Sequence, residues 1–170
     1  YEAPPLGALI RAGATPSIYA VVADVTTSSL DPTRRVIARG IDASSETDVY
    51  CSNPQLERLL HTYFQAMIVG YAEDSGSVHQ YLPPLPPRIH TFVYSCTPIE
   101  TCTFTKHLDF LSLLTQANPL ISDEVLAACL RRSAQAYQDP HAFLLRASRE
   151  LAALLASETQ RLTQILRKLT

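Results

Sequence analysis

Three side chains, His90, Cys96 and His107, have the chemistry to act as catalysts in this 170-residue chain. A thiol beside an imidazole can form a nucleophilic pair, in which the imidazole accepts the proton from sulfur. Their separation in the sequence does not show that the three side chains meet. An enzyme with a site assembled from these dispersed residues is therefore kept only as an alternative.

Motifs that would indicate other reactions do not occur. No glycine precedes a lysine, so the sequence has no phosphate-binding loop, and neither G-x-G-x-x-G nor G-x-S-x-G is present. The five histidines show no H-x-H or H-x-x-x-H spacing. His107 and Asp109 fall on an expected helix, where positions two apart point about 200° away from each other. We predict no catalytic residues, no cofactor, no metal site and no small-molecule substrate.

The four cysteines, Cys51, Cys96, Cys102 and Cys129, form no C-x-x-C pair. They are too few for a disulfide-stabilised scaffold and have the wrong spacing for structural zinc. Free thiols in a reducing compartment are the simplest interpretation. With no apolar run as long as the roughly 18 residues of a membrane span, and no visible signal peptide, we predict a cytoplasmic protein. Tyr1 stands almost directly ahead of the first expected strand, and we expect residues, including a further strand, to precede it.

The positions of charged residues divide the chain into two parts. Residues 1–103 carry six Lys/Arg and ten Asp/Glu, a net −4, whereas residues 104–170 carry eight and six, a net +2. At 46% hydrophobic and 18% charged residues, the chain can bury a core. The asymmetry is weaker than the concentrated basic face that nucleic-acid binding usually shows. We therefore keep nucleic-acid binding as an alternative to binding a protein.

The first half has the pattern of a small β-barrel. Short apolar runs, rich in β-branched and aromatic residues and bounded by turns, predict strands at 8–11, 18–25, 66–71 and 89–94, with a further one from Arg35 to Ile41. Asn53 and Pro54 form a helix start, and helical spacing of Leu56, Leu59, Leu60 and Tyr63 predicts an inserted helix from Pro54 to about Tyr63. We expect that helix to plug one end of the barrel.

The segment Pro83-Pro84-Leu85-Pro86-Pro87 must lie outside a central strand, because proline cannot donate to the ladder and fixes φ. We expect an exposed, extended crossing between two strands. The motif with Arg88 also matches a PxxP ligand, but its place between apolar strands favours a structural role. Tyr81 and Arg88 beside it are predicted to be partner contacts.

After Pro98 the apolar period changes from two to about 3.6, and all five glycines lie before it. Helices are predicted from Phe104 to Gln116, from Asp123 to Gln138 with Ser122 as N-cap, and from Pro140 to about Lys168 with Asp139 as N-cap. The last would be long and unbroken.

Alternating four-and-three spacing in that last helix resembles a coiled-coil seam, formed by Leu151, Leu155, Glu158, Leu162, Ile165 and Leu169. The five aliphatic members are predicted partner contacts. Two alternatives stay open: packing on the protein's own barrel and helices, or self-association and partner binding.

The strands also resemble a known family. The runs Pro5–Ile10, Ile18–Val25 and Ala66–Tyr71, followed by Pro83–Pro87 and Val93-Tyr94, are similar to the HAS-barrel. This is the N-terminal β-barrel of HerA-type DNA-translocating ATPases, similar to that of ATP synthase α and β subunits. Ala20 stands where the family usually has glycine, and the ATPase core is missing. The resemblance implies a barrel used for ring assembly or docking, without a motor and without catalytic residues.

Together these observations predict an α+β protein. A small antiparallel β-barrel with one inserted helix would occupy residues 1–97, and a helical region with a long last helix residues 98–170. We expect a non-enzymatic assembly or docking module that self-associates or binds a protein partner. The alternatives are an accessory factor of a nucleic-acid-processing ATPase and the enzyme with a dispersed site.

Overall fold

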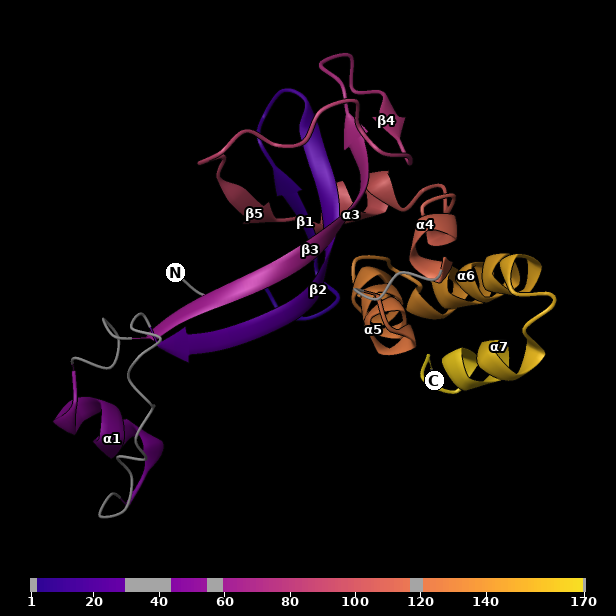
Figure 1. Ribbon diagram of the computed structural model, residues 1–170. Coiled ribbons are helices and arrows are strands. Elements are labelled where there is room, and N and C mark those ends of the chain that lie inside the picture. The colour runs from indigo at the N-terminus through magenta and orange to yellow at the C-terminus, as the bar shows by residue number, and fades with distance from the viewer. Residues whose placement is uncertain (1–2, 30–43, 55–59, 117–120, 170) are drawn as a thin grey trace.

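The computed structural model describes residues 3–29, 44–54, 60–116 and 121–169, and it shows an α+β chain, as predicted (Figure 1). The strands are β1 (Leu9–Ala12), β2 (Ser17–Ser29), β3 (Leu60–Ala72), β4 (Val78–His79) and β5 (Val93–Ser95). The helices are α1 (Glu46–Ser52), α3 (Pro98–Phe104), α4 (Leu111–Thr115), α5 (Asp123–Ala134), α6 (Pro140–Leu154) and α7 (Thr159–Leu166). The predicted strand from Arg35 to Ile41 lies outside the described residues.

The five strands form one curled antiparallel sheet in the order β4-β3-β2-β1-β5, which is half of a barrel (Figure 1). Among the described strands, β4 and β5 are therefore the two edges. The predicted strands at 8–11, 18–25 and 66–71 are present, and Pro83–Pro87 crosses from β4 to β5 outside any strand, as expected.

Strand β2 is buried on both faces, which explains its nearly continuous apolar run from Ile18 to Ala23. Successive side chains of a strand point to opposite faces of the sheet. Tyr19, Val21 and Ala23 pack against the helices, whereas Ala20 and Val22 belong to a second cluster on the opposite face. The other members of that second cluster are Ala8 and Ile10, with Phe64, Ala66 and Ile68 packed against them.

A register irregularity between Val22 and Asp24 marks the point where burial ends. Beyond it β2 and β3 continue as a two-stranded ribbon, in which Asp24 to Thr27 are exposed and Thr27 shares a side-chain hydrogen bond of 2.9 Å with Thr62. Figure 1 shows α1 beyond the far end of this ribbon, away from the helices that cover the sheet.

The predicted inserted helix is wrong at its C-terminal end. Leu60 and Tyr63 lie in β3, where pairing with β2 places Tyr63 opposite Thr26 and leaves it 56% exposed. The described helix of this region, α1, begins earlier, with the Ser45 hydroxyl accepting a hydrogen bond from the Asp48 N–H. Residues 55–59 of the predicted helix lie outside the described residues. Pairing of β3 with β2 over twelve residue pairs outweighed the helical spacing of a few leucines.

The predicted strand from Ile89 to Tyr94 is correct only at its end, because β5 begins at Val93. Before it the chain makes a turn in which the Thr91 N–H donates to the Arg88 carbonyl at 3.1 Å, and His90 has a φ of 66°. A positive φ is uncommon for a residue with a side chain. Ile89 and Phe92 are therefore on the surface and not inside a sheet.

The predicted helix from Phe104 to Gln116 is correct only over α4, since α3 ends at Phe104, where that helix was expected to begin. Thr97 and Glu100 form a capping box at the start of α3, with Pro98 in its first turn. The link to α4 is held by the side chain of Gln80, which donates to the Phe104 and His107 carbonyls and accepts from the Phe110 N–H. One amide thus satisfies backbone groups at the end of α3 and the start of α4.

The N-caps predicted for the next two helices are confirmed. Ser122 accepts from the Val125 N–H at the start of α5, and Asp139 accepts from the Ala142 N–H at the start of α6. In both cases a short polar side chain satisfies an N–H that has no partner within the helix.

One long last helix is not what the structure shows. Helix α6 ends at Leu154 and α7 begins at Thr159, and the segment between them lets α7 turn back toward α5 (Figure 1). Arg161 fixes this return, because its guanidinium binds Asp123 at the start of α5 at 2.9 Å and donates to the Thr115 carbonyl. The turn buries both α6 and α7 against one core, which an unbroken helix could not do.

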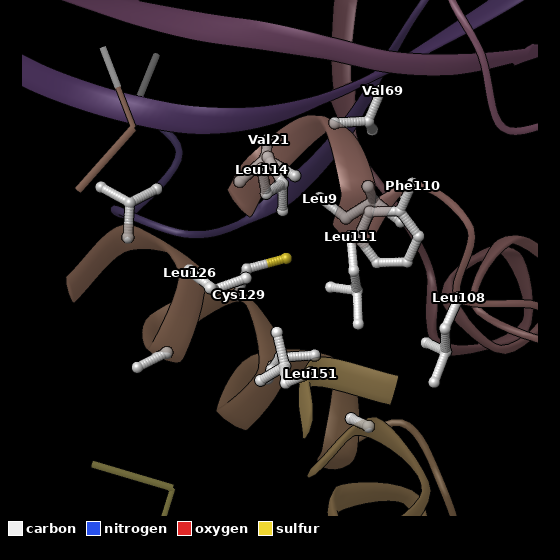
Figure 2. Packing of buried hydrophobic residues seen from close by; sticks show 14 of the residues in the cluster. Leu9, Val21, Val69, Leu108, Phe110, Leu111, Leu114, Leu126, Cys129 and Leu151 are labelled. Carbon is white, nitrogen blue, oxygen red and sulfur yellow. The ribbon is translucent and has the colours of Figure 1, made fainter. Parts of the chain in front are cut away.

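The main core joins the sheet to the helices. Figure 2 shows Leu9, Val21 and Val69 from the strands facing Leu111 and Leu114, with further buried residues from α5 and α6 below them. The core therefore spans the predicted boundary between residues 97 and 98.

Gly70 lets the Phe104 ring approach β3. A Cβ at this position would overlap the carbonyl oxygen of His79 and lie 2.9 Å from Phe104 Cε2. Phe104 also stacks on Tyr19, with ring centroids 4.6 Å apart, and packs on Phe110 at 5.4 Å. The absence of one side chain thus makes room for the aromatic contact between the two parts of the protein.

We expect Gly70→Ala to destabilise the protein by about 3 kcal/mol, the upper range for overpacking a close contact. Gly76→Ala is the matched control, because a Cβ there meets nothing within 4 Å and only its φ of 81° is strained. That strain costs about 1 kcal/mol. Urea denaturation of the two variants measures the difference. Equal losses of unfolding free energy would contradict the close packing at Gly70.

Candidate interaction surface

Large apolar side chains are exposed mainly between residues 81 and 99. Of the fourteen exposed large hydrophobic residues in the described part of the chain, eight lie in this segment. They are Tyr81 (56% exposed), Leu82 (58%), Leu85 (74%), Ile89 (88%), Phe92 (72%), Val93 (42%), Tyr94 (50%) and Ile99 (80%). Isolated exposed apolar residues are normal, whereas a concentration of them typically marks an interaction site.

The segment also contains β5, whose outer side pairs with no strand of the described part of the chain. The Phe92 carbonyl accepts from the Gly13 N–H, and the Cys96 N–H donates to the Leu9 carbonyl. The backbone groups of Phe92 and Cys96 therefore point toward β1. Backbone groups in an antiparallel ladder alternate in direction. The backbone N–H and C=O groups of Tyr94 therefore also point toward β1, whereas those of Val93 and Ser95 point to the open edge of the sheet.

Arg88 stands at the start of this edge. The Arg88–Thr91 turn folds its backbone beside the first residues of the strand, and its side chain is exposed. With Thr91 and Gly13 it lines a groove of about 370 Å³ between Pro83–Pro87 and the β1–β2 turn. No described residue forms an ion pair with Arg88.

The neighbouring arginine, by contrast, is fully engaged. Arg11 Nε lies 2.6 Å from Glu100 Oε1, and its guanidinium lies 5.1 Å from the centre of the Tyr94 ring. Burial alone would raise the pKa of Glu100, but the hydrogen bonds from Thr97 and Arg11 outweigh it and hold that pKa below its ordinary value. Arg11 therefore anchors β1 to α3 and supports one face of β5.

Tyr81, a predicted partner contact, is exposed at the opposite end of the crossing. Its hydroxyl lies 3.2 Å from His79 Nδ1 and 3.4 Å from the Tyr71 hydroxyl, and its ring packs edge-on against Tyr71. The hydrogen bond with Tyr81 raises the pKa of Tyr71 to about 12. Tyr71 is thus a neutral hydrogen-bonding group at physiological pH. Glu73 lies nearby, with its carboxylate 3.4 Å from His79 Nε2.

The residues of the alternative catalytic site are not brought together. In the described ranges, no hydrogen bond or ring contact joins His90, Cys96 and His107, and both histidines are exposed. Burial raises the pKa of the Cys96 thiol to about 12, with a further increase from Glu100. A nucleophilic cysteine needs the opposite shift, because the thiolate is the reactive form.

The predicted contacts on the last helix lie in the protein's own core. Leu151 (0% exposed), Leu155 (2%), Ile165 (0%) and Leu169 (7%) are buried, and Leu162 packs against the same cluster. In the folded chain this seam is therefore covered by α5 and the neighbouring helices. The heptad-like spacing of these residues reflects packing within the chain.

The arginines of the C-terminal half are mostly engaged within the chain. Arg132 donates to the Leu6 carbonyl, Arg146 to the Thr105 carbonyl, and Arg161 binds Asp123. Arg131 donates to the Lys168 carbonyl, and Lys168 binds Glu124. These contacts spread the positive charge over several elements, and nothing about them indicates a nucleic-acid surface.

A second hollow, of about 710 Å³, lies beside the start of α6, lined by Cys102, Tyr137, Phe143 and Arg146 among others. Its polar groups already bind each other. Cys102 Sγ donates to the Ala136 carbonyl, Tyr137 and Thr105 share a hydroxyl hydrogen bond of 2.8 Å, and Arg146 lies over the Phe143 ring. The hollow offers few free groups to orient a ligand.

Comparisons with protein-family models, with curated proteins and with solved structures gave no match. Among the described residues, no helix combines the length and the apolar character needed to cross a membrane.

The sequence predicts Tyr81 and Arg88 as contacts, and the structure exposes both, but the exposed apolar residues between and after them were missed. The predicted strand from Ile89 to Tyr94 placed Ile89 and Phe92 within a sheet. The turn that exposes them depends on a positive φ at His90, which no glycine or asparagine indicates in the sequence.

The buried thiol of Cys129 should make the protein sensitive to alkali. Burial raises its pKa from 9.0 to about 12. Because the folded state holds the proton more tightly, this contribution to stability is complete below pH 9 and is lost as pH rises toward 12. At pH 10.5 we expect it to have fallen by about 2 kcal/mol.

The measurement is urea denaturation at pH 8 and pH 10.5 under reducing conditions. We expect Cys129→Ala to lose less unfolding free energy between the two pH values than the unsubstituted protein. Cys51→Ala, which alters an exposed thiol, should behave like the unsubstituted protein. The same loss in all three proteins would show that Cys129 does not titrate as described.

Proposed function

We propose that the protein is a non-enzymatic docking module, and that the edge of β5 with the exposed segment around it is its binding surface. We call residues 81–99 the docking segment. The observation that carries the proposal is the coincidence of exposed apolar side chains with a sheet edge whose outward backbone groups have no partner among the described residues. Edges of this kind pair readily with another chain unless they are blocked.

The docking segment lacks most features that protect an edge strand. Lysine, inward-pointing charge and a covering helix or loop are the usual means of blocking. The segment contains no lysine, its prolines lie in the crossing and at the start of α3 and not in β5, and the side chains beside the edge are Phe92, Val93 and Tyr94. An unprotected apolar edge on a stable body favours a function in which it is covered.

We include in this proposal that the sheet is related to the HAS-barrel, which the strands resemble. The curled antiparallel sheet supports it at the level of architecture, and the family's use of the barrel for assembly agrees with a docking role. The free state of the four cysteines supports the cytoplasmic location proposed with it.

Photo-crosslinking tests the docking segment directly. With benzoylphenylalanine in place of Phe92, or separately of Ile89, we expect a discrete covalent adduct in extracts of the source cells, identified by mass spectrometry. The matched control replaces Leu145, which is 47% exposed on α6, and should give no such adduct. Because the crosslinker reacts only within contact distance, the adduct places the partner on the segment.

Light scattering on the purified protein complements this test. An adduct with a different protein supports hetero-docking, and an adduct with a second copy, accompanied by a dimer that Phe92→Ser dissociates, supports self-assembly. Equal crosslinking at Phe92, Ile89 and Leu145, or none at Phe92 and Ile89 in a monomeric protein, would contradict the proposed function.

A further inference from the structure

We infer that the partner is an extended peptide segment that adds to β5 as an antiparallel strand and places a carboxylate on Arg88. The inference rests on the proposed function and names the kind of partner the docking segment accepts. It follows from three features: the direction of the free backbone groups, the position of Arg88, and the distribution of charge around the edge.

The backbone groups define the binding mode. Val93 and Ser95 each present one donor and one acceptor outward, the set that a new antiparallel strand requires for two pairs of hydrogen bonds. Continued pairing past Ser95 is blocked, because the Thr97 N–H is bound to Glu100 and α3 begins at Pro98. The added strand is therefore short, and it has to gain further affinity from its side chains and from its other end.

The position of Arg88 defines the orientation. An antiparallel strand on β5 has its C-terminal end beside the N-terminal end of β5, where the Arg88–Thr91 turn lies. Arg88 is exposed and has no ion-pair partner in the described ranges, whereas Arg11 on the other side of β5 is neutralised by Glu100. An uncompensated guanidinium at this point suits a carboxylate at the C-terminal end of the incoming strand.

The turn that carries Arg88 supports a binding role. His90 holds a φ of 66°, where a residue with a side chain is strained, and such strain is concentrated at binding sites. Because of this turn, Arg88 lies next to Thr91, and the residues before Val93 do not extend β5 at its N-terminal end. The guanidinium therefore stays at the end of the edge.

A second copy of this chain fits the edge less well. Pairing of β5 with its own copy would set Val93 opposite the second Ser95, and the second α3 would begin at the level of Arg88. The acid nearest to that position, Glu100, is already held by Arg11 and Thr97. Arg88 would then stay without a counter-charge, so a different segment satisfies the surface better.

The carboxylate has two sources with the same chemistry, the C-terminus of the partner or an Asp or Glu side chain near the end of the strand. We test them with a library of random nonapeptides displayed with free C-termini, selected on the full chain. We expect enriched sequences with alternating apolar residues. The enriched peptides are then synthesised as free acids and as C-terminal amides, and their affinities are measured by fluorescence anisotropy.

Two variants separate the two interactions. Ser95→Pro removes an N–H that points outward while leaving the β1–β5 hydrogen bonds intact, and we expect it to abolish binding without unfolding the protein. Arg88→Gln should weaken binding at least tenfold and remove its dependence on salt, and Arg88→Lys should restore part of it. Arg149→Gln, a change at an exposed arginine on α6, is the control and should bind as the unsubstituted protein does.

The acid and amide forms identify the source. If amidation lowers the affinity for the unsubstituted protein but not for Arg88→Gln, the carboxylate that binds Arg88 is the C-terminus of the peptide. If amides that contain Asp or Glu keep the affinity of the free acids, the carboxylate is a side chain. The inference would be overturned if the peptides bound Ser95→Pro with undiminished affinity, or if their affinity did not depend on Arg88. It would also be overturned if selection on the unsubstituted protein enriched no peptides beyond those enriched on Ser95→Pro. A crosslinked hetero-adduct without peptide enrichment would overturn this inference alone and leave the docking function standing.

Discussion

The contact of the Phe104 ring with Gly70 and Tyr19 is the interaction on which the arrangement of sheet and helices depends. Because β3 has no side chain at that position, the end of α3 can approach the strand at backbone distance. Gln80 then donates to the carbonyls of Phe104 and His107 and accepts from the N–H of Phe110, the N-cap of α4, so the hairpin after β3 also fixes where the next helix starts. The sheet and the helices are thereby held by one continuous core, and the docking segment is attached to it at both ends, through β4 and through α3.

This attachment explains how an apolar segment can stay exposed without collapsing. The four prolines of the crossing restrict the backbone, so the segment loses little entropy on being ordered, and their nitrogens cannot donate further ladder hydrogen bonds. At one end Tyr81 contacts Tyr71 and His79, and at the other β5 pairs with β1. The segment is therefore held by its neighbours at both ends, which would lower the cost of ordering it on binding of the proposed partner.

Much of the fold could be predicted from the sequence where the information is local. The strands around Ile18 and Ala66 and the N-caps Ser122 and Asp139 follow from residue type and spacing. The errors arose where tertiary contacts decide. The leucines of the last helix have the spacing of a coiled coil, yet the ion pair of Arg161 with Asp123 and burial against α5 favour two shorter helices. Of the candidate surface, Tyr81 and Arg88 were predictable beside the proline segment, whereas the free edge of β5 depends on strand order, which a single sequence does not reveal.

The unsupported half of the β2–β3 ribbon has a mechanical consequence. Its strands keep their register to Ser29 and Leu60, but their side chains leave the core at the irregularity next to Asp24. At about 3.3 Å per residue, the part beyond Asp24 is a lever of roughly 17 Å. A rotation of about 10° at its root moves the tip by about 3 Å, on the basis of that same length. Small changes of twist in the sheet are thus amplified into displacements of the end that carries α1, far from the surface where β5 lies.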